Sequence, residues 1–444
     1  MNAEERLEKY LSIVPNAVQK RAQRENFNVF FHYGLNTFTG KEWGDGKVDP
    51  KEFNPTAQDT DQWIRTAKNA GAYGVILTCK HHDGFCLWQT ATTDYSVASS
   101  PYKDGKGDVV REVSDSCRKY GLKFGIYLSP WDRNHPTYGQ GDAYNDVYCA
   151  QLTELLTGYG EVFCVWLDGA CGSYMDGKPK QIYDWARYFS LIRELAPNAC
   201  ISNCGPDIRW VGNEGGFARE SEWNVVPKFA CDIQTIESNS QQADDEKFAK
   251  KGADIISSDL GSRDFLKNFD EFMWYPAEVD VSIRPGWFYH KSQDVAVRSV
   301  DNLKRIYYDS VGGNTFLLLN IPPDTKGLIH EKDVKTMQEL GEHIRSSNQQ
   351  LLAVKEITAP PAEVGNEIEN ALKYEYDENT FDPISYYTPE KESDSYAIKI
   401  TLDSEHRINR IKLVENVAFS QRIETFDLYV YVHGKRRKAR SGTT

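Results

Sequence analysis

Short β-rich apolar runs alternate with amphipathic stretches along the first three quarters of the chain. The apolar runs show little alternation with polar residues, which is typical of strands buried on both faces. We expect strands at residues 28–35, 73–85, 123–130, 161–169, 199–205 and 314–323. The stretches between them have helical periodicity, and we expect helices at residues 56–72, 108–121, 142–160, 181–197 and 294–313.

This repetition predicts parallel strands joined by right-handed helical crossovers. A doubly wound sheet usually has a glycine-rich turn after its first strand. Here the first strand ends in His32-Tyr33-Gly34 without that motif. Polar residues instead gather at the C-terminal ends of many strands, where a barrel has its active site. We therefore predict a (β/α)₈-like TIM barrel, with its sixth and seventh strands obscured within residues 217–290.

The pattern changes after residue 345, where polar and proline-containing segments suggest a linker. Strictly alternating runs follow, and they predict antiparallel strands of a small β-sandwich at residues 395–402, 407–415 and 425–434. A sandwich of the usual size needs more residues, so we expect this domain to be short or cut off.

These patterns divide the chain into two predicted domains, a catalytic barrel over residues 1–345 and a C-terminal β-sandwich over residues 346–444. The basic run Lys435 to Lys438 is interpreted as an exposed turn, with an anion-binding patch as the alternative.

The composition narrows the class of protein. The 444 residues are 40% hydrophobic and 26% charged, as in an ordinary globular protein. The net charge of −13 argues against nucleic acid or an anionic membrane as the main partner. No apolar run approaches the length of a membrane-spanning helix. The oligomeric state is left open.

Two further features concern the cellular compartment. The N-terminal stretch lacks the apolar core and cleavage site of a secretory signal. This predicts a cytoplasmic protein, or a periplasmic or secreted one whose signal has been removed. The nine cysteines are an odd number with scattered spacing, so we expect reduced, structural thiols and no disulfide framework.

Carboxylates provide the clearest candidate chemistry. Asp168 directly follows an apolar strand and precedes Gly169, which would place it at the barrel mouth; the alternative is an N-cap of the next helix. Glu214 lies in a glycine-flanked loop, and Glu220 and Glu222 are close competitors. Paired carboxylates across a cleft suit glycoside hydrolysis.

Histidines and tryptophans accompany the carboxylates. His81 and His82 end the second strand, and on a continuing strand only one of them could face a site. They could bind hydroxyl groups, or ligate a metal together with Asp168 and His32. All tryptophans lie between Trp43 and Trp287, which favours a carbohydrate site in the first 300 residues.

Several of these motifs together resemble the α-L-fucosidases of glycoside hydrolase family 29. They are FHYGLNTF with Glu42-Trp43, TCKHHDGFCLW, GIYLSPWDRN, VWLDGA, RPGWFY and GGNTFLLLNIPPDTKGLI, in the order of that family over residues 28–330. The resemblance implies a barrel followed by a β-sandwich, a retaining mechanism, a fucosylated glycan as substrate, and no cofactor or metal.

Individual roles are implied by the same motifs. Asp168 of WLDGA matches the nucleophile. Glu214 of WVGNE matches the acid/base of the branch selective for α-1,3 and α-1,4 linkages on branched glycans. The substrate-binding positions that the resemblance implies are His32, Glu42, Trp43, His81, His82, Tyr127, Trp131, His135 and Trp287.

Three alternatives remain open from the sequence. They are an α-L-fucosidase of broad linkage specificity, a metal-dependent barrel hydrolase, and a catalytically inactive carbohydrate-binding protein. For the retaining mechanism, the Asp168 and Glu214 carboxyl groups should lie about 5–5.5 Å apart.

Overall fold

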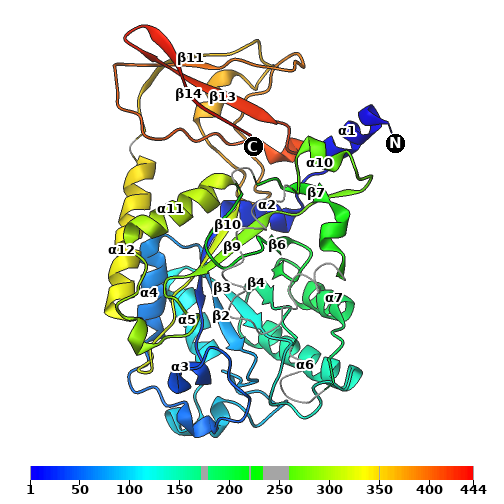
Figure 1. Ribbon diagram of the computed structural model, residues 1–444, viewed down its shortest axis with the longest axis vertical. Coiled ribbons are helices and arrows are strands. Elements are labelled where there is room, and N and C mark those ends of the chain that lie inside the picture. The colour runs from blue at the N-terminus through cyan, green and yellow to red at the C-terminus, as the bar shows by residue number, and fades with distance from the viewer. Residues whose placement is uncertain (1, 172–178, 220–221, 234–259, 350, 444) are drawn as a thin grey trace.

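The computed structural model describes residues 2–171, 179–219, 222–233, 260–349 and 351–443. Its centre is a closed barrel of eight parallel strands in the order β1-β10-β9-β6-β5-β4-β3-β2 (Figure 1). The strands are β1 (Phe27–Phe31), β2 (Gly74–Lys80), β3 (Lys123–Leu128), β4 (Val162–Leu167), β5 (Cys200–Asn203), β6 (Ile208–Trp210), β9 (Ala277–Ser282) and β10 (Phe316–Asn320). The predicted barrel is confirmed, and the doubly wound alternative is excluded.

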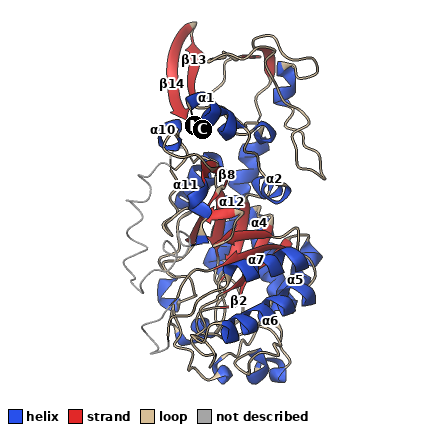
Figure 2. Ribbon diagram, turned by 90° about the vertical axis from the view of Figure 1, so that its right-hand side faces the viewer, coloured by secondary structure: helices blue, strands red, loops and turns tan. Residues whose placement is uncertain are grey.

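Helices cover the outside of the barrel (Figure 2). They are α4 (Thr60–Ala70), α5 (Val109–Tyr120), α6 (Asp142–Gly158), α7 (Trp185–Leu195), α11 (Val300–Ser310) and α12 (Glu331–Gln349). The first five match predicted helices. Helix α12 was not expected from the sequence, and it continues past the predicted domain boundary at residue 345. Left-handed Gly71 and Gly121 end α4 and α5.

The N-terminal end of the barrel is closed by α2 (Ala17–Arg24). Gln19 donates hydrogen bonds to the carbonyls of Asp207 and Trp274, at 2.9 and 2.8 Å. Arg21 donates to the carbonyls of Phe163 and Asn198, at 3.1 and 2.7 Å. The open mouth of the barrel therefore lies at the C-terminal ends of its strands, beside α3 (Leu35–Thr39).

Two barrel strands differ from their predicted places. β6 precedes residues 217–290 and overlaps residues 209–216, which we interpreted as a loop, because a strand of three residues is too short to show a pattern. β9 does lie within that stretch, but Glu278 and Asp280 interrupt its apolar run.

Two small groups of elements lie beside the closed end. One contains α1 (Ala3–Leu11), α10 (Arg263–Leu266) and the antiparallel pair β7 (Val225–Pro227) and β8 (Phe272–Trp274). The other is the C-terminal region, where β11 (Val354–Thr358) pairs with β12 (Lys399–Leu402) and β13 (Thr425–Val432) with β14 (Lys435–Thr443). Both C-terminal pairs are antiparallel, as predicted.

Two C-terminal predictions are wrong. Residues 407–415 form no strand, although their sequence alternates. The basic run from Lys435 to Lys438 begins β14 and is not a turn. The turn is formed by the two residues directly before this run, His433 and Gly434, whose φ values of 50° and 73° suit a tight hairpin connection.

The C-terminal region attaches to the closed end of the barrel, away from α3 (Figure 1). Lys20 Nζ of α2 lies 2.6 Å from Asp382 Oδ1. The guanidinium of Arg24, at the end of α2, stacks on Tyr376 at 3.4 Å from the ring centroid. The C-terminal region therefore lies at the end of the barrel opposite to its mouth.

Two expectations about the whole chain can be compared with the described residues. All nine cysteines are free, and seven are buried, as expected for reduced structural thiols. Within the described segments, no helix is both long enough and apolar enough to cross a membrane.

Candidate active site

Asp168 stands at the barrel mouth, directly after β4. Its Oδ2 accepts a hydrogen bond from the hydroxyl of Tyr127 at 2.8 Å, and its Oδ1 accepts one from the backbone N–H of Ala170 at 2.8 Å. The side chain keeps 22% exposure, so a ligand can reach it. The N-cap interpretation is wrong, because α7 begins at residue 185 and is capped by Asp184.

Glu214 lies in the loop after β6, also at the barrel mouth. Its Oε2 accepts a hydrogen bond from the indole N–H of Trp287 at 3.0 Å. A backbone bridge between Gly215 and Val281 holds this loop against β9. Burial, together with the nearby charges of Asp168 and Glu42, raises the pKa of Glu214 to about 7. Glu214 can therefore keep its proton in neutral solution, as a general acid must.

The competing glutamates are placed differently. Glu222 is buried and accepts hydrogen bonds from Arg209 at 2.5 Å and Arg219 at 2.7 Å. Burial alone would raise the pKa of Glu222, but the two arginines outweigh it and leave that pKa below its usual range. An ionised, doubly paired carboxylate is a poor proton donor. Glu220 lies outside the described residues.

Three histidine rings line the mouth. The ring centroids of His32 and His81 are 5.8 Å apart, and those of His81 and His82 are 4.1 Å apart. His81 and His82 both face inward because β2 has already ended at Lys80. Burial lowers the pKa of His32 to about 3 and of His82 to about 4, and it holds the pKa of His81 well below its usual range. All three rings are therefore neutral hydrogen-bonding groups.

Aromatic rings surround the histidines. The Trp287 ring lies against His32, with 4.9 Å between ring centroids. Trp131 lies 4.9 Å from His82, and Trp43 lies 6.5 Å from Trp131. Trp43 is 38% exposed, unlike the buried Trp131, so its ring can cover an incoming ligand.

Glu42 holds the loop that carries Trp287. Its Oε2 accepts a hydrogen bond from the Trp287 backbone N–H at 2.8 Å, and its Oε1 lies 2.5 Å from His290 Nε2. Both carboxylate oxygens thus have partners within the protein. His290 was not identified from the sequence, although it closes the RPGWFYH segment.

His135 stands apart from the other predicted sugar contacts. Its Nδ1 lies 2.8 Å from the Thr137 hydroxyl, and its Nε2 lies 3.3 Å from the Thr92 carbonyl. The side chain is buried in the loop after β3. A sugar contact for His135 remains a prediction.

Sequence reasoning missed two buried acids and one amide at the inner wall. Asp280 accepts a hydrogen bond from the Trp210 indole at 2.7 Å, and Glu278 accepts one from the Trp166 indole at 2.7 Å. Burial raises the pKa of Glu278 to about 7 and that of Asp280 well above its usual range. Two acids inside the otherwise apolar run AEVDVS could have indicated these buried carboxyl groups from the sequence. The amide is Asn320, which at the end of β10 contacts His32 after β1 and Ser282 in β9.

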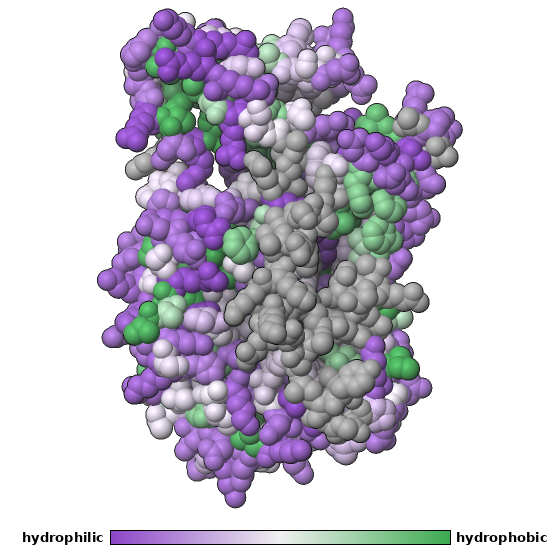
Figure 3. Space-filling view, in the orientation of Figure 1, coloured by the Kyte–Doolittle hydropathy of each residue, from purple (hydrophilic) through white to green (hydrophobic). Residues whose placement is uncertain are grey.

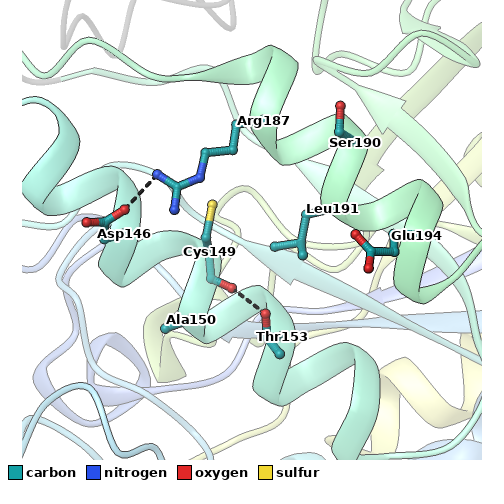
Figure 4. A pocket seen from close by; sticks show the side chains of 8 residues that line it. All are labelled: Asp146, Cys149, Ala150, Thr153, Arg187, Ser190, Leu191 and Glu194. Atoms are coloured by element: carbon teal, nitrogen blue, oxygen red, sulfur yellow. Dashed lines mark hydrogen bonds and ion pairs between the residues drawn. The ribbon is translucent and has the colours of Figure 1, made fainter.

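A separate cavity of about 400 Å³ lies on the outer surface between α6 and α7 (Figure 4). Asp146 and Arg187 form an ion pair there at 2.7 Å. None of the predicted site residues lines this cavity, so it is distinct from the barrel mouth.

Comparisons with known proteins agree with this geometry. Residues 3–349 match the family model described as alpha-L-fucosidase. Alpha-L-fucosidase 1 of Arabidopsis thaliana is 39% identical over 97% of this chain and 80% of its own. A crystal structure from Bacteroides ovatus ATCC 8483 has a TM-score of 0.83 at 42% identity, covering 100% of this chain and 70% of that one.

A GH29 fucosidase of Ruminococcus gnavus, solved in complex with fucose, has a TM-score of 0.81 at 27% identity. The alignment covers 97% of this chain and 87% of that one. With the family model spanning most of the chain and a relative matching nearly all of it, the chain belongs to the α-L-fucosidases of glycoside hydrolase family 29 and is a glycoside hydrolase.

Proposed function

We propose that this fucosidase releases terminal α-L-fucose by retaining double displacement, with Asp168 as nucleophile and Glu214 as acid/base. The observation that carries this assignment is the contrast between the two carboxyl groups. Both side chains are partly exposed, but Asp168 accepts two hydrogen bonds, whereas Glu214 beside it accepts one from Trp287 and has a pKa raised to about 7. Two carboxyls in unequal environments can take unequal roles in one reaction.

In the first step, an Asp168 oxygen forms a bond to C1 of fucose while the bond from C1 to the leaving oxygen breaks. Glu214 transfers its proton to that oxygen, and the rest of the glycan departs. In the second step, the Glu214 carboxylate takes a proton from water. The resulting hydroxyl attacks C1 and frees Asp168, so the anomeric configuration is retained.

The remaining residues bind the sugar. The neutral rings of His32, His81 and His82 hydrogen-bond its hydroxyl groups, and Tyr127 holds Asp168 in place. Trp43, Trp131 and Trp287 cover the apolar edge that includes the C6 methyl group. Glu42 positions Trp287 by accepting a hydrogen bond from its backbone N–H. The fucose bound by the Ruminococcus gnavus neighbour supports fucose as the occupant of this site.

The acid/base assignment is tested by chemical rescue. Glu214→Ala should cleave an aryl fucoside with a good leaving group to the covalent intermediate and then stall. Azide needs no general base, so it should restore turnover and yield α-fucosyl azide. Rescue of Glu220→Ala or Glu222→Ala instead would move the role to that residue. Rescue of none of the three variants would contradict the assignment of Glu214.

For the substrate, we propose α-1,3- and α-1,4-linked fucose on branched glycans. The proposal is supported by the resemblance of the WVGNE loop at residues 210–214, which presents Glu214 to the leaving group. The test is a comparison of kcat/KM on Lewis trisaccharides, 2′-fucosyllactose and an α-1,6-fucoside. Equal rates would favour broad specificity, and efficient cleavage of 2′-fucosyllactose alone would contradict the proposal.

No observation favours the metal-dependent alternative. Among residues whose placement is described, no three His, Cys, Asp or Glu side chains form a group that could hold a metal ion. We expect exhaustive chelation to leave fucosidase activity unchanged. Loss of activity with EDTA and its return with zinc would contradict this.

A further inference from the structure

The three neutral histidines of the mouth each have one ring nitrogen bound to the protein and one available to a ligand. A neutral imidazole carries its proton on only one nitrogen, so the free nitrogen is either a donor or an acceptor. The protein partner determines which, because it must receive or supply a hydrogen at the other nitrogen. These partners are Asn320, Ser129 and Asn36.

For His32, the orientation of the Asn320 amide is decisive. Asn320 Nδ2 donates to the carbonyl of Trp287 at 2.8 Å and to the hydroxyl of Ser282 at 2.9 Å. A carbonyl can only accept, so the amide nitrogen must face Trp287. Asn320 Oδ1 then faces the His32 backbone N–H at 3.1 Å and His32 Nδ1 at 2.9 Å. His32 Nδ1 must therefore carry the proton, and Nε2 is a bare acceptor.

For His82, the Ser129 hydroxyl is decisive. Ser129 Oγ donates to the carbonyl of Trp131 at 3.0 Å, which uses its only hydrogen. The same oxygen lies 2.7 Å from His82 Nδ1, and a Ser129 hydroxyl that donates to Trp131 accepts there. His82 Nδ1 therefore carries the proton. Its bare Nε2 lies 3.8 Å from Asp168 Oδ2, so two acceptors face each other across the site.

His81 has the opposite arrangement. Asn36 Nδ2 donates to the carbonyl of Glu42 at 3.1 Å, which fixes the orientation of that amide. The same nitrogen lies 3.4 Å from His81 Nδ1, which must accept its second hydrogen. The His81 proton is thus on Nε2.

We propose that Asn320, Ser129 and Asn36 are positioning residues that fix these protons before any ligand binds. The sugar site then presents ring acceptors at His32 Nε2 and His82 Nε2, and one ring donor at His81 Nε2. The identity of the sugar rests on the proposed function, but the proton positions are a property of the empty protein. The low pKa values of the three rings support the proposal, because no ring becomes a cation near neutrality.

The arrangement has a consequence for ligand choice. A group placed between His82 Nε2 and Asp168 Oδ2 must donate a hydrogen bond, since both protein atoms are acceptors. A sugar hydroxyl satisfies this demand, whereas fluorine cannot donate. At one position of fucose, deoxyfluoro substitution should therefore weaken binding as much as removal of the hydroxyl, by about tenfold or more.

The direct test is ¹⁵N–¹H correlation spectroscopy of the ring nitrogens in full-length protein labelled with ¹⁵N-histidine. Signals are assigned by replacing His32, His81 and His82 one at a time with Gln. We expect Nδ1 to be protonated in His32 and His82, and Nε2 in His81, at pH 7 and before sugar is added. The opposite tautomer at any of the three, or averaging between tautomers, would overturn the proposal.

Ser129→Ala tests the cause. Loss of its hydroxyl should let His82 populate both tautomers and should weaken L-fucose binding about tenfold. Ser310→Ala is the matched control, because it removes an equally buried hydroxyl, bonded to Ile306, from α11. An unchanged His82 signal in folded Ser129→Ala would refute the role of Ser129. If that variant does not fold, the wild-type spectrum decides alone.

Adding L-fucose separates this proposal from the proposed function. If the protons are fixed before binding, fucose should shift the three ring signals without changing any tautomer. A tautomer change on binding would overturn the proposal. If fucose shifts none of the signals while the expected tautomers are present, the proton assignment stands and the sugar assignment fails.

Discussion

The barrel and the C-terminal region are built from strands that differ in burial. Every residue of β10 (FLLLN) is buried, whereas β13 (TFDLYVYV) alternates between half-buried and exposed positions. In Figure 3, hydrophobic side chains are visible at the top left, over the C-terminal strands. Tyr431 is 64% exposed and Leu413 is 60% exposed. The barrel therefore provides the dense, dry surroundings that shift the pKa values of the histidines at its mouth.

Two of the contacts between the regions are also exposed, although Ser420 and Gln421 make buried hydrogen bonds to Tyr10 and Asn224. Lys20 with Asp382 and Arg263 with Glu424 are ion pairs that solvent can reach. Such pairs contribute at most about 1 kcal/mol each. Because they lie at the closed end, we expect changes in the C-terminal region to leave the chemistry at the mouth intact.

The largest expected effect is on the nucleophile in the barrel. Asp168→Asn should lower kcat by at least about 10⁴-fold, equivalent to more than about 5 kcal/mol of barrier, while L-fucose still binds. Asp146→Asn, on the outer surface of α6, is the control and should keep full activity. An Asp168→Asn enzyme with a tenth of normal activity would contradict the assignment.

The second prediction compares the two regions directly. Leu318→Ala, in the barrel interior, should lower the free energy of unfolding by about 2–5 kcal/mol, because it leaves a cavity in a tightly packed core. Leu413→Ala, in the exposed C-terminal segment, should change it by less than about 0.5 kcal/mol. Urea unfolding of both variants measures this. Equal losses would show that the C-terminal region packs as a second core.

The third prediction concerns the carboxyl of Glu214. Its folded-state pKa of about 7 lies above its ordinary value of 4.5, so the folded protein binds this proton more tightly than the unfolded chain does. Stability from this group is fully present below about pH 4.5 and is lost as the pH rises to about 7, a loss on the order of 3 kcal/mol.

Glu214→Gln removes this penalty. The variant should gain stability over the wild type at pH 8 and little at pH 4.5, as measured by urea unfolding at both values. In the wild type, log kcat/KM should fall as the pH rises above about 7, because the general acid loses its proton. A stability gain that is equal at both pH values would show that Glu214 is not the titrating group.

The smallest effect is expected in the C-terminal hairpin. Lys438 Nζ lies 2.7 Å from Asp427 Oδ1 in an exposed pair across β13 and β14. Lys438→Met should leave the unfolding midpoint and the fucosidase activity unchanged at physiological salt, because solvent and ions screen this pair. A clear loss of either would mean that this hairpin matters to the barrel.

The same difference in burial explains which strands could be predicted from the sequence. Barrel strands such as β4 and β10 are predictable because burial on both faces demands continuous apolar runs. β6 is too short for such a run, and β9 contains acids that only the three-dimensional structure shows to be paired with tryptophans. In the C-terminal region, alternation predicted a strand at residues 407–415 that is not there, because exposed apolar residues impose no pairing.

The candidate site follows a similar rule. Asp168, His81 and His82 were identifiable because polar residues at the ends of apolar strands converge in any barrel. The amides beside the histidine rings, Asn36 at His81 and Asn320 at His32, carry no such signal in the sequence. Their importance depends on which atoms they face, and this is visible only from the folded geometry.

Trp287 contacts the proton donor as well as two residues on the sugar-binding side of the mouth. Its backbone N–H bonds to Glu42, its carbonyl accepts from Asn320, and its indole bonds to the proton donor Glu214. Substitutions at these positions should therefore be epistatic, with coupling energies of about 0.5–3 kcal/mol. A change at residue 287 that is tolerated in one fucosidase background can then be lethal to activity in another, depending on which residues accompany it at positions 42 and 214.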